Sequence, residues 1–226
     1  MIALEDRLAA VTAEIVDAAR AAGRAPGDIT TIVVTKFHPA SLVRELAALG
    51  VSDFGESRHQ EARPKIAELT DVPAVWHFVG QVQSKKARQI RAYVDVMHSV
   101  DRSSLLGALA ADPTTGESLD VFIQVNLTDD PDRGGAAPQV VRDLADRVAV
   151  APGLRLRGLM AVAPQNGEAR REFARVRELS ERLGENHPEA TALSMGMSGD
   201  FRDAILEGAT HLRIGTAITG NRPTSG

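Results

Sequence analysis

The chain has 226 residues, enough to bury one sizeable hydrophobic core. Apolar residues make up 43% and charged residues 25% of the chain, which is the balance of an ordinary globular domain. The net charge of -4 disfavours a nucleic-acid or anionic-membrane partner, and the absence of cysteine excludes disulfides, thiolate metal sites and cysteine nucleophiles.

The segment 4–22 predicts an amphipathic helix. It is rich in alanine and carries Leu4, Leu8, Val11 and Ile15 at helical spacing. The sequence has no uncharged apolar stretch near the roughly 20 residues that a membrane helix needs. The first residues also lack the basic start and apolar run of a signal peptide. We therefore expect a soluble, cytoplasmic protein.

After this helix the sequence alternates between short apolar runs and helical segments. Strands are predicted at 29–35, 51–54, 75–79, 94–99, 119–126, 154–162, 192–195 and 211–214. Helices are predicted between them at 39–49, 58–69, 84–91, 102–111, 138–150, 168–183 and 200–207.

This alternation requires parallel strands with right-handed crossovers, and eight such units favour a closed barrel over an open sheet. We predict a single (β/α)8 TIM barrel domain over 1–226 with an extra N-terminal helix. Little chain is left for a helix after the last strand, and 221–226 is expected to form a frayed tail.

Lys36 follows the first predicted strand. The loops that follow the strands build the active site in barrels of this kind, so we expect its amine at the functional rim. A lysine amine that is desolvated in a pocket is a nucleophile suited to forming imines with aldehydes. A lone lysine after a strand is, however, more often an ordinary surface residue.

Glycine-containing turns follow the last two predicted strands, at 194–200 and 213–217. Phosphate sites in such barrels commonly use these two loops, where backbone N–H groups and a helix N-terminus meet the anion. Ser198 and Thr216 can add hydroxyl donors. The same turns could instead serve only to cap helices. A phosphate site facing the Lys36 amine favours a phosphorylated aldehyde, of which pyridoxal 5′-phosphate (PLP) is the commonest.

Arg213 ends the eighth predicted strand and is expected near the same pocket. PLP enzymes place either an acid or an arginine against the pyridine nitrogen. Because arginine only donates hydrogen bonds, it keeps that nitrogen unprotonated, and the ring is then a poorer electron sink. This predicts weak carbanion chemistry. The alternative is that Arg213 pairs with a surface carboxylate.

Several motifs resemble the pyridoxal phosphate homeostasis protein family. In chain order they are DFGE at 53–56, WHFVGQVQSKK at 76–86, LRGLMA at 156–161, SMGMS at 194–198 and RIGTAI at 213–218. The resemblance covers about residues 2–222 and implies a PLP-binding barrel related to the N-terminal domain of alanine racemase. The cofactor-binding residues that it implies are Lys36 as the Schiff-base lysine, Arg213 at the pyridine nitrogen, Ser198, Gly215 and Thr216 at the phosphate, and Met195 lining the ring.

The sequence departs from the family pattern at two positions near Lys36. Ser57 stands where asparagine is usual, which weakens a hydrogen bond carried over to the cofactor. His38 stands where a second lysine is usual, so a secondary lysine site is not supported.

The resemblance implies a non-catalytic PLP carrier that serves intracellular vitamin B6 homeostasis, with PLP-dependent apoenzymes as acceptors. A racemase needs a second acid/base group, but the one tyrosine, Tyr93, precedes the fourth strand on the wrong side of the barrel. One alternative is a weakly active PLP-dependent amino-acid enzyme, racemase-like or transaminase-like. Another is a lyase that forms an imine between Lys36 and a phosphorylated sugar. We expect a monomer, because no large apolar stripe is left over.

The six histidines are scattered over different elements without His-Glu-x-x-His spacing, so no metal site is predicted. His77 and His98 are expected at the pocket mouth, as an interpretation equal in weight to simple packing. The basic segment 83–91 is read as a solvated helix face, with retention of an anionic cofactor or contact with an acceptor protein as the alternative.

Overall fold

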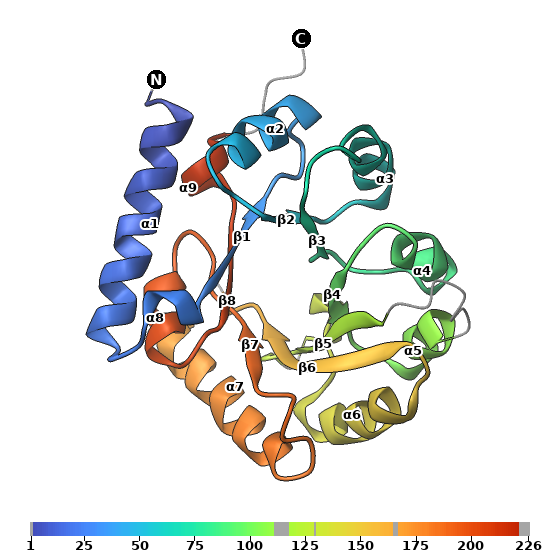
Figure 1. The fold of residues 1–226 in the computed structure, drawn as a ribbon. Helices are drawn as coiled ribbons and strands as arrows, with labels where there is room; N and C mark the ends of the chain where they lie inside the picture. Colours follow the sequence, from blue (N-terminus) through green and yellow to red (C-terminus); the bar gives the residue numbers. More distant parts are fainter. Residues whose placement is uncertain (1, 111–117, 129, 165–166, 222–226) are drawn as a thin grey trace.

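Eight parallel strands close into a barrel in the computed structural model, which describes residues 2–110, 118–128, 130–164 and 167–221 (Figure 1). The strands are β1 (Thr30–Val34), β2 (Asp53–Glu56), β3 (Val75–Phe78), β4 (Val96–Val100), β5 (Leu119–Val125), β6 (Leu154–Ala161), β7 (Ala192–Ser194) and β8 (His211–Ile214). They pair in chain order, and parallel pairing of β8 with β1 closes the barrel. The predicted fold class and strand order are confirmed, with small shifts at the strand ends.

Helices surround the barrel on its outer face (Figure 1). They are α1 (Leu4–Ala21), α2 (Ala40–Ala48), α3 (His59–Glu68), α4 (Ser84–Arg91), α5 (Ser103–Ala110), α6 (Val141–Val150), α7 (Ala169–Gly184), α8 (Phe201–Leu206) and α9 (Thr216–Thr219). Among the described residues, none of these helices combines the length and apolar character needed to cross a membrane.

The structure differs from the predicted helices at a few places. The short turn α9 follows β8, where little chain seemed to remain. The 3-10 turns η1 (Pro26–Asp28), η2 (Pro131–Arg133) and η3 (Pro138–Val140) each begin at a proline, whose fixed φ suits the first position of a helical turn. The helix predicted from residue 138 therefore starts with η3 and continues as α6. Residues 111 and 222–226, in a predicted helix end and the predicted tail, lie outside the described residues.

Helix α1 packs outside the barrel against α8 and α9 (Figure 1). One face of the helix buries Val11, Ile15 and Ala19, which recur every four residues as an amphipathic helix requires. Arg7 on the same helix donates from Nε to the carbonyl oxygen of Ile218 at 2.7 Å. The predicted N-terminal helix thus supports the segment that follows the last strand.

The main apolar core lies between the strands and the helices. Every residue of β4 is buried, as expected for a parallel strand that is covered on both faces. A second, smaller apolar cluster consists of Val96, Phe122 and Met160, on three neighbouring strands. Polar side chains lie beside this second cluster, and they matter for the site described next.

Strands β6 and β7 approach so closely at Gly158 that only glycine fits. A Cβ built on Gly158 would lie 1.9 Å from the carbonyl oxygen of Ala192, and the φ of +150° is also unfavourable for other residues. The pairing of Gly158 with Ala192 therefore depends on the glycine of the LRGLMA motif.

Candidate functional site

Lys36 lies at the barrel mouth, immediately beyond β1. Its side chain is exposed, whereas the preceding Thr35 is fully buried. The next residue, Phe37, has a φ of 68°, a left-handed conformation that is costly for a bulky side chain. The Lys36 Nζ lies 5.9 Å from the centroid of the Phe37 ring. The chain therefore turns sharply just after Lys36 and leaves its amine accessible at the mouth.

A buried ion pair supports the backbone beneath Lys36. Lys65 Nζ donates to Glu56 Oε1 at 2.6 Å and to the carbonyl oxygen of Thr35 at 2.9 Å. The Thr35 hydroxyl also donates to Glu56 Oε1, at 2.8 Å. Burial raises the pKa of Glu56 in spite of these donors. The three side chains thus fix the position from which Lys36 emerges, and we call them the Thr35–Glu56–Lys65 support.

The turns after β7 and β8 meet at the same mouth. The Ser198 hydroxyl accepts a hydrogen bond from the backbone N–H of Ala217 at 3.4 Å, which connects the two turns. Gly215 caps the N-terminus of α9 and is followed by Thr216. The first N–H groups of a helix have no partner within the helix, so this turn offers donors to an anion.

Gly215 also lies against the end of β1. A Cβ built on Gly215 would be 3.8 Å from both the Cβ and the carbonyl oxygen of Val34, which is two residues before Lys36. This contact follows from the parallel pairing of β8 with β1. The structure therefore brings the Lys36 segment and the glycine turn together at one side of the mouth.

Arg213 lies in β8 and is almost fully buried, with 5% of its surface exposed. It donates from Nη1 to Ser194 Oγ at 2.7 Å and from Nη2 to the carbonyl oxygen of Ala161 at 2.8 Å. Burial lowers the pKa of Arg213 to about 10, so the guanidinium stays charged at neutral pH. The alternative of a pairing with a surface carboxylate is wrong, because its partners are a buried hydroxyl and a carbonyl.

Met195, the remaining predicted site residue, is fully buried in the main apolar core. Its backbone N–H donates to the carbonyl oxygen of His211 in β8. The structure thus places Met195 next to the β7–β8 pair, and a contact with the cofactor ring stays a prediction.

His77 and His98 lie within their strands, and the prediction that they line the mouth is wrong. His98 is fully buried and His77 is 2% exposed. His77 Nε2 is 3.0 Å from Oδ1 of Asp53, the first residue of β2. The predicted strands 75–79 and 94–99 already included both histidines, but the sequence did not show that their side chains are buried among the strands.

Sequence reasoning missed the Thr35–Glu56–Lys65 support and the hydrogen bonds made by the two histidines. Glu56 was the available signal for the support, because it stands at the end of an apolar strand. A carboxylate that is buried there needs a hydrogen-bonding or charged partner. Among the described residues, no group of three or more histidine or acidic side chains is placed to hold a metal ion.

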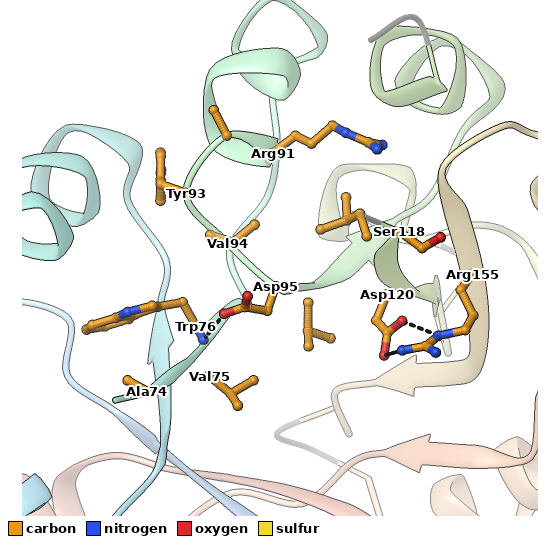
Figure 2. A pocket seen from close by; sticks show the side chains of 13 residues that line it. Ala74, Val75, Trp76, Arg91, Tyr93, Val94, Asp95, Ser118, Asp120 and Arg155 are labelled. Carbon is orange, nitrogen blue, oxygen red and sulfur yellow. Dashed lines mark hydrogen bonds and ion pairs between the residues drawn. The ribbon is translucent and has the colours of Figure 1, made fainter. Parts of the chain in front are cut away.

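Cavities occur at both ends of the barrel. One of about 230 Å³ lies at the mouth, at the carboxyl ends of β3, β5 and β6, and its lining includes Gln81, Gln124 and Arg133. Another, of about 590 Å³, lies where β3 to β6 begin, and Figure 2 shows Trp76, Asp95 and the Asp120–Arg155 ion pair around it. None of the six predicted site residues lines either of these two cavities. Barrel enzymes place their chemistry at the carboxyl ends of the strands, so we assign the site to the mouth.

Known proteins share both the sequence and the fold of this chain. The family model for the alanine racemase N-terminal domain matches residues 8–223. A pyridoxal phosphate homeostasis protein from Pseudomonas aeruginosa is 43% identical over 223 residues, which cover 98% of this chain and 97% of that protein. The structure of PipY from Synechococcus elongatus with PLP bound has 36% identity and a TM-score of 0.84, over 96% of this chain and all of that one.

A more distant likeness concerns the fold alone. An alanine racemase from Corynebacterium glutamicum is 16% identical, with a TM-score of 0.71, over 98% of this chain and 62% of the racemase. The fold and the mouth thus define a β/α barrel of the alanine racemase N-terminal type. Within that class, the chain belongs to the pyridoxal phosphate homeostasis protein family, which confirms the resemblance found in the motifs.

Replacement of Lys65 by methionine tests the Thr35–Glu56–Lys65 support. Lys65→Met leaves Glu56 buried without its cation, so we expect the free energy of unfolding to fall by about 3 kcal/mol. Arg44→Met is the control, because it breaks an ion pair with Asp71 that is exposed to solvent. Urea unfolding monitored by circular dichroism measures both. Equal losses in the two variants would contradict a supporting role for the buried pair.

His211 predicts a pH dependence of stability. Burial lowers its pKa to about 4, with further contributions from His77 and Arg157. As the pH falls below about 6.5, the unfolded chain therefore binds a proton that the folded protein does not, and stability decreases by up to about 1.4 kcal/mol per pH unit. We expect His211→Gln to have a shallower loss of stability between pH 6.5 and 5 than the wild type. Equal slopes for the two proteins in urea unfolding would show that His211 does not contribute.

Proposed function

We propose that this chain binds PLP as a Schiff base on Lys36 and serves intracellular PLP homeostasis as a carrier. The observation that carries the proposal is the approach of Gly215 to Val34, because it sets a glycine turn beside the strand that ends at Lys36. PLP has an aldehyde and a phosphate on the same small ring, so it needs an amine and an anion site that are close together. PipY, which has PLP bound, and the homeostasis proteins are similar over nearly the whole chain, which supports the proposal.

The residues at the mouth fit the chemistry of the cofactor. When bound, PLP supplies an aldehyde, and the Lys36 Nζ would form the bond to its carbon with loss of water. The Ser198 hydroxyl and the backbone of Gly215 and Thr216 would hold the phosphate. Arg213 uses two of its guanidinium N–H groups within the protein, and a guanidinium has five, so donors remain for the pyridine nitrogen.

The carrier role is favoured over a racemase because the one tyrosine of the chain does not lie near Lys36. Tyr93 is the one tyrosine, and it precedes β4 and lines the cavity at the other end of the barrel (Figure 2). Its hydroxyl is 3.0 Å from His59 Nδ1, and burial raises its pKa, so it is poorly suited to proton transfer. We further propose that the protein acts in the cytoplasm as a monomer and that PLP-dependent apoenzymes accept its PLP.

Absorbance spectroscopy of Lys36→Ala tests the covalent attachment. The wild type incubated with PLP should show the visible band of a protonated Schiff base. Lys36→Ala should lose this band, because the neighbouring Lys65 amine is buried and paired with Glu56. Lys85→Ala is the matched control, since it removes an exposed lysine of α4 and should leave the band unchanged. A band that persists in Lys36→Ala, or is absent from the wild type, would contradict the proposal.

A further inference from the structure

A continuous chain of hydrogen bonds runs from Arg213 to the opposite end of the barrel. Arg213 Nη1 is 2.7 Å from Ser194 Oγ, which is 2.8 Å from His98 Nδ1. His98 Nε2 is 2.9 Å from His77 Nδ1, and His77 Nε2 is 3.0 Å from Asp53 Oδ1. The five side chains come from β8, β7, β4, β3 and β2, in that order. We call them the Arg213–Asp53 chain.

The donor at one end and the acceptor at the other fix the direction of every hydrogen bond. Arginine only donates, so the Ser194 oxygen accepts from Arg213 and its own hydrogen is available for His98 Nδ1. His98 must then carry its proton on Nε2 and donate to His77 Nδ1. His77 in turn carries its proton on Nε2 and donates to the Asp53 carboxylate. Each link is satisfied with both rings neutral and both ends charged.

The surroundings favour this distribution of charge. Burial lowers the pKa of His98 well below its ordinary value, and its ring stacks on Phe122 with centroids 4.6 Å apart. Burial of Asp53 acts to raise its pKa, but hydrogen bonds from His77 and Ser52 hold the net value below the ordinary one. A neutral imidazole between a guanidinium and a carboxylate is therefore the stable arrangement.

We infer that Ser194, His98 and His77 are positioning residues for Arg213, and that they fix the orientation of the guanidinium toward the cofactor from the far end of the barrel. This inference rests on the proposed function, because it assigns the guanidinium to the pyridine nitrogen. An arginine side chain has many rotamers, and a hydroxyl whose hydrogen is directed at His98 presents its lone pairs in fixed directions. The guanidinium is thereby held in one orientation before the ligand arrives, which reduces the entropic cost of binding.

Nuclear magnetic resonance of the protein without PLP tests the Arg213–Asp53 chain independently of cofactor binding. In protein labelled with 15N-histidine, we expect His77 and His98 both to carry the proton on Nε2 at neutral pH. In Ser194→Ala, His98 Nδ1 loses its donor, so the 15N shift of that atom should change. An Nδ1–H tautomer of either ring in the wild type would overturn the inference, whatever the protein does with PLP.

PLP titration of variants then tests the effect on the site. We expect Ser194→Ala to raise the Kd for PLP about tenfold and to shift the absorbance maximum of bound PLP, since one hydrogen bond of the guanidinium is lost. Ser194→Thr keeps the hydroxyl and should restore both values toward those of the wild type. Ser180→Ala is the control, because Ser180 is buried in α7 and is not part of the Arg213–Asp53 chain. This variant should bind PLP as the wild type does.

His77→Gln provides a second test if Ser194→Ala does not fold. It interrupts the chain two links away from Arg213, so we expect a smaller effect, a Kd raised about threefold with the absorbance shift in the same direction. Wild-type affinity and absorbance in both Ser194→Ala and His77→Gln would overturn the inference while the proposed function stands. Failure of the wild type to bind PLP would instead refute the proposed function. The histidine tautomers would still decide whether the hydrogen bonds of the Arg213–Asp53 chain are formed.

Discussion

The pairing of β8 with β1 is the constraint on which the site depends. Val33 pairs with Ile214 in parallel register, so the first and last strands end side by side at the mouth. Lys36 and Gly215 lie near opposite ends of the sequence, yet the closure of the barrel makes their segments neighbours. A phosphorylated aldehyde needs an amine and an anion site that are close together, and closure brings the two segments that would supply them side by side. Helix α1 packs on α8 and α9 and so supports this seam from outside.

The interior beneath the mouth contains charged and polar groups that interact in two separate arrangements. The Thr35–Glu56–Lys65 support fixes the backbone from which Lys36 emerges, and the Arg213–Asp53 chain fixes the guanidinium. Both arrangements bury charge, which is costly unless each group has partners. Glu56 Oε2 is the one buried side-chain N or O atom without a hydrogen-bond partner among the described residues. A structure that tolerates such costs beneath one rim is typical of a binding site, where orientation matters more than maximal stability.

Much of this arrangement could be predicted from the sequence. Apolar runs separated by helical segments placed the strands, and the rule that loops after strands form the site selected Lys36, Ser198 and Thr216. The sequence did not predict where side chains lie along the barrel axis or in which direction they point. His77 and His98 were expected at the mouth, but both side chains are buried within the barrel. The contact between Glu56 and Lys65 depends on how α3 packs on β2, and no local pattern in the sequence records that packing.

Peptide mapping after borohydride reduction is the most direct test of the central claim, that the Lys36 amine and the glycine turn hold one cofactor between them. Protein saturated with PLP is reduced, digested and analysed by mass spectrometry. The account predicts one pyridoxyl group per chain, on the peptide that contains Lys36. A pyridoxyl group found instead on Lys65, Lys85 or Lys86, or spread over several lysines, would show that the mouth does not hold PLP in this way.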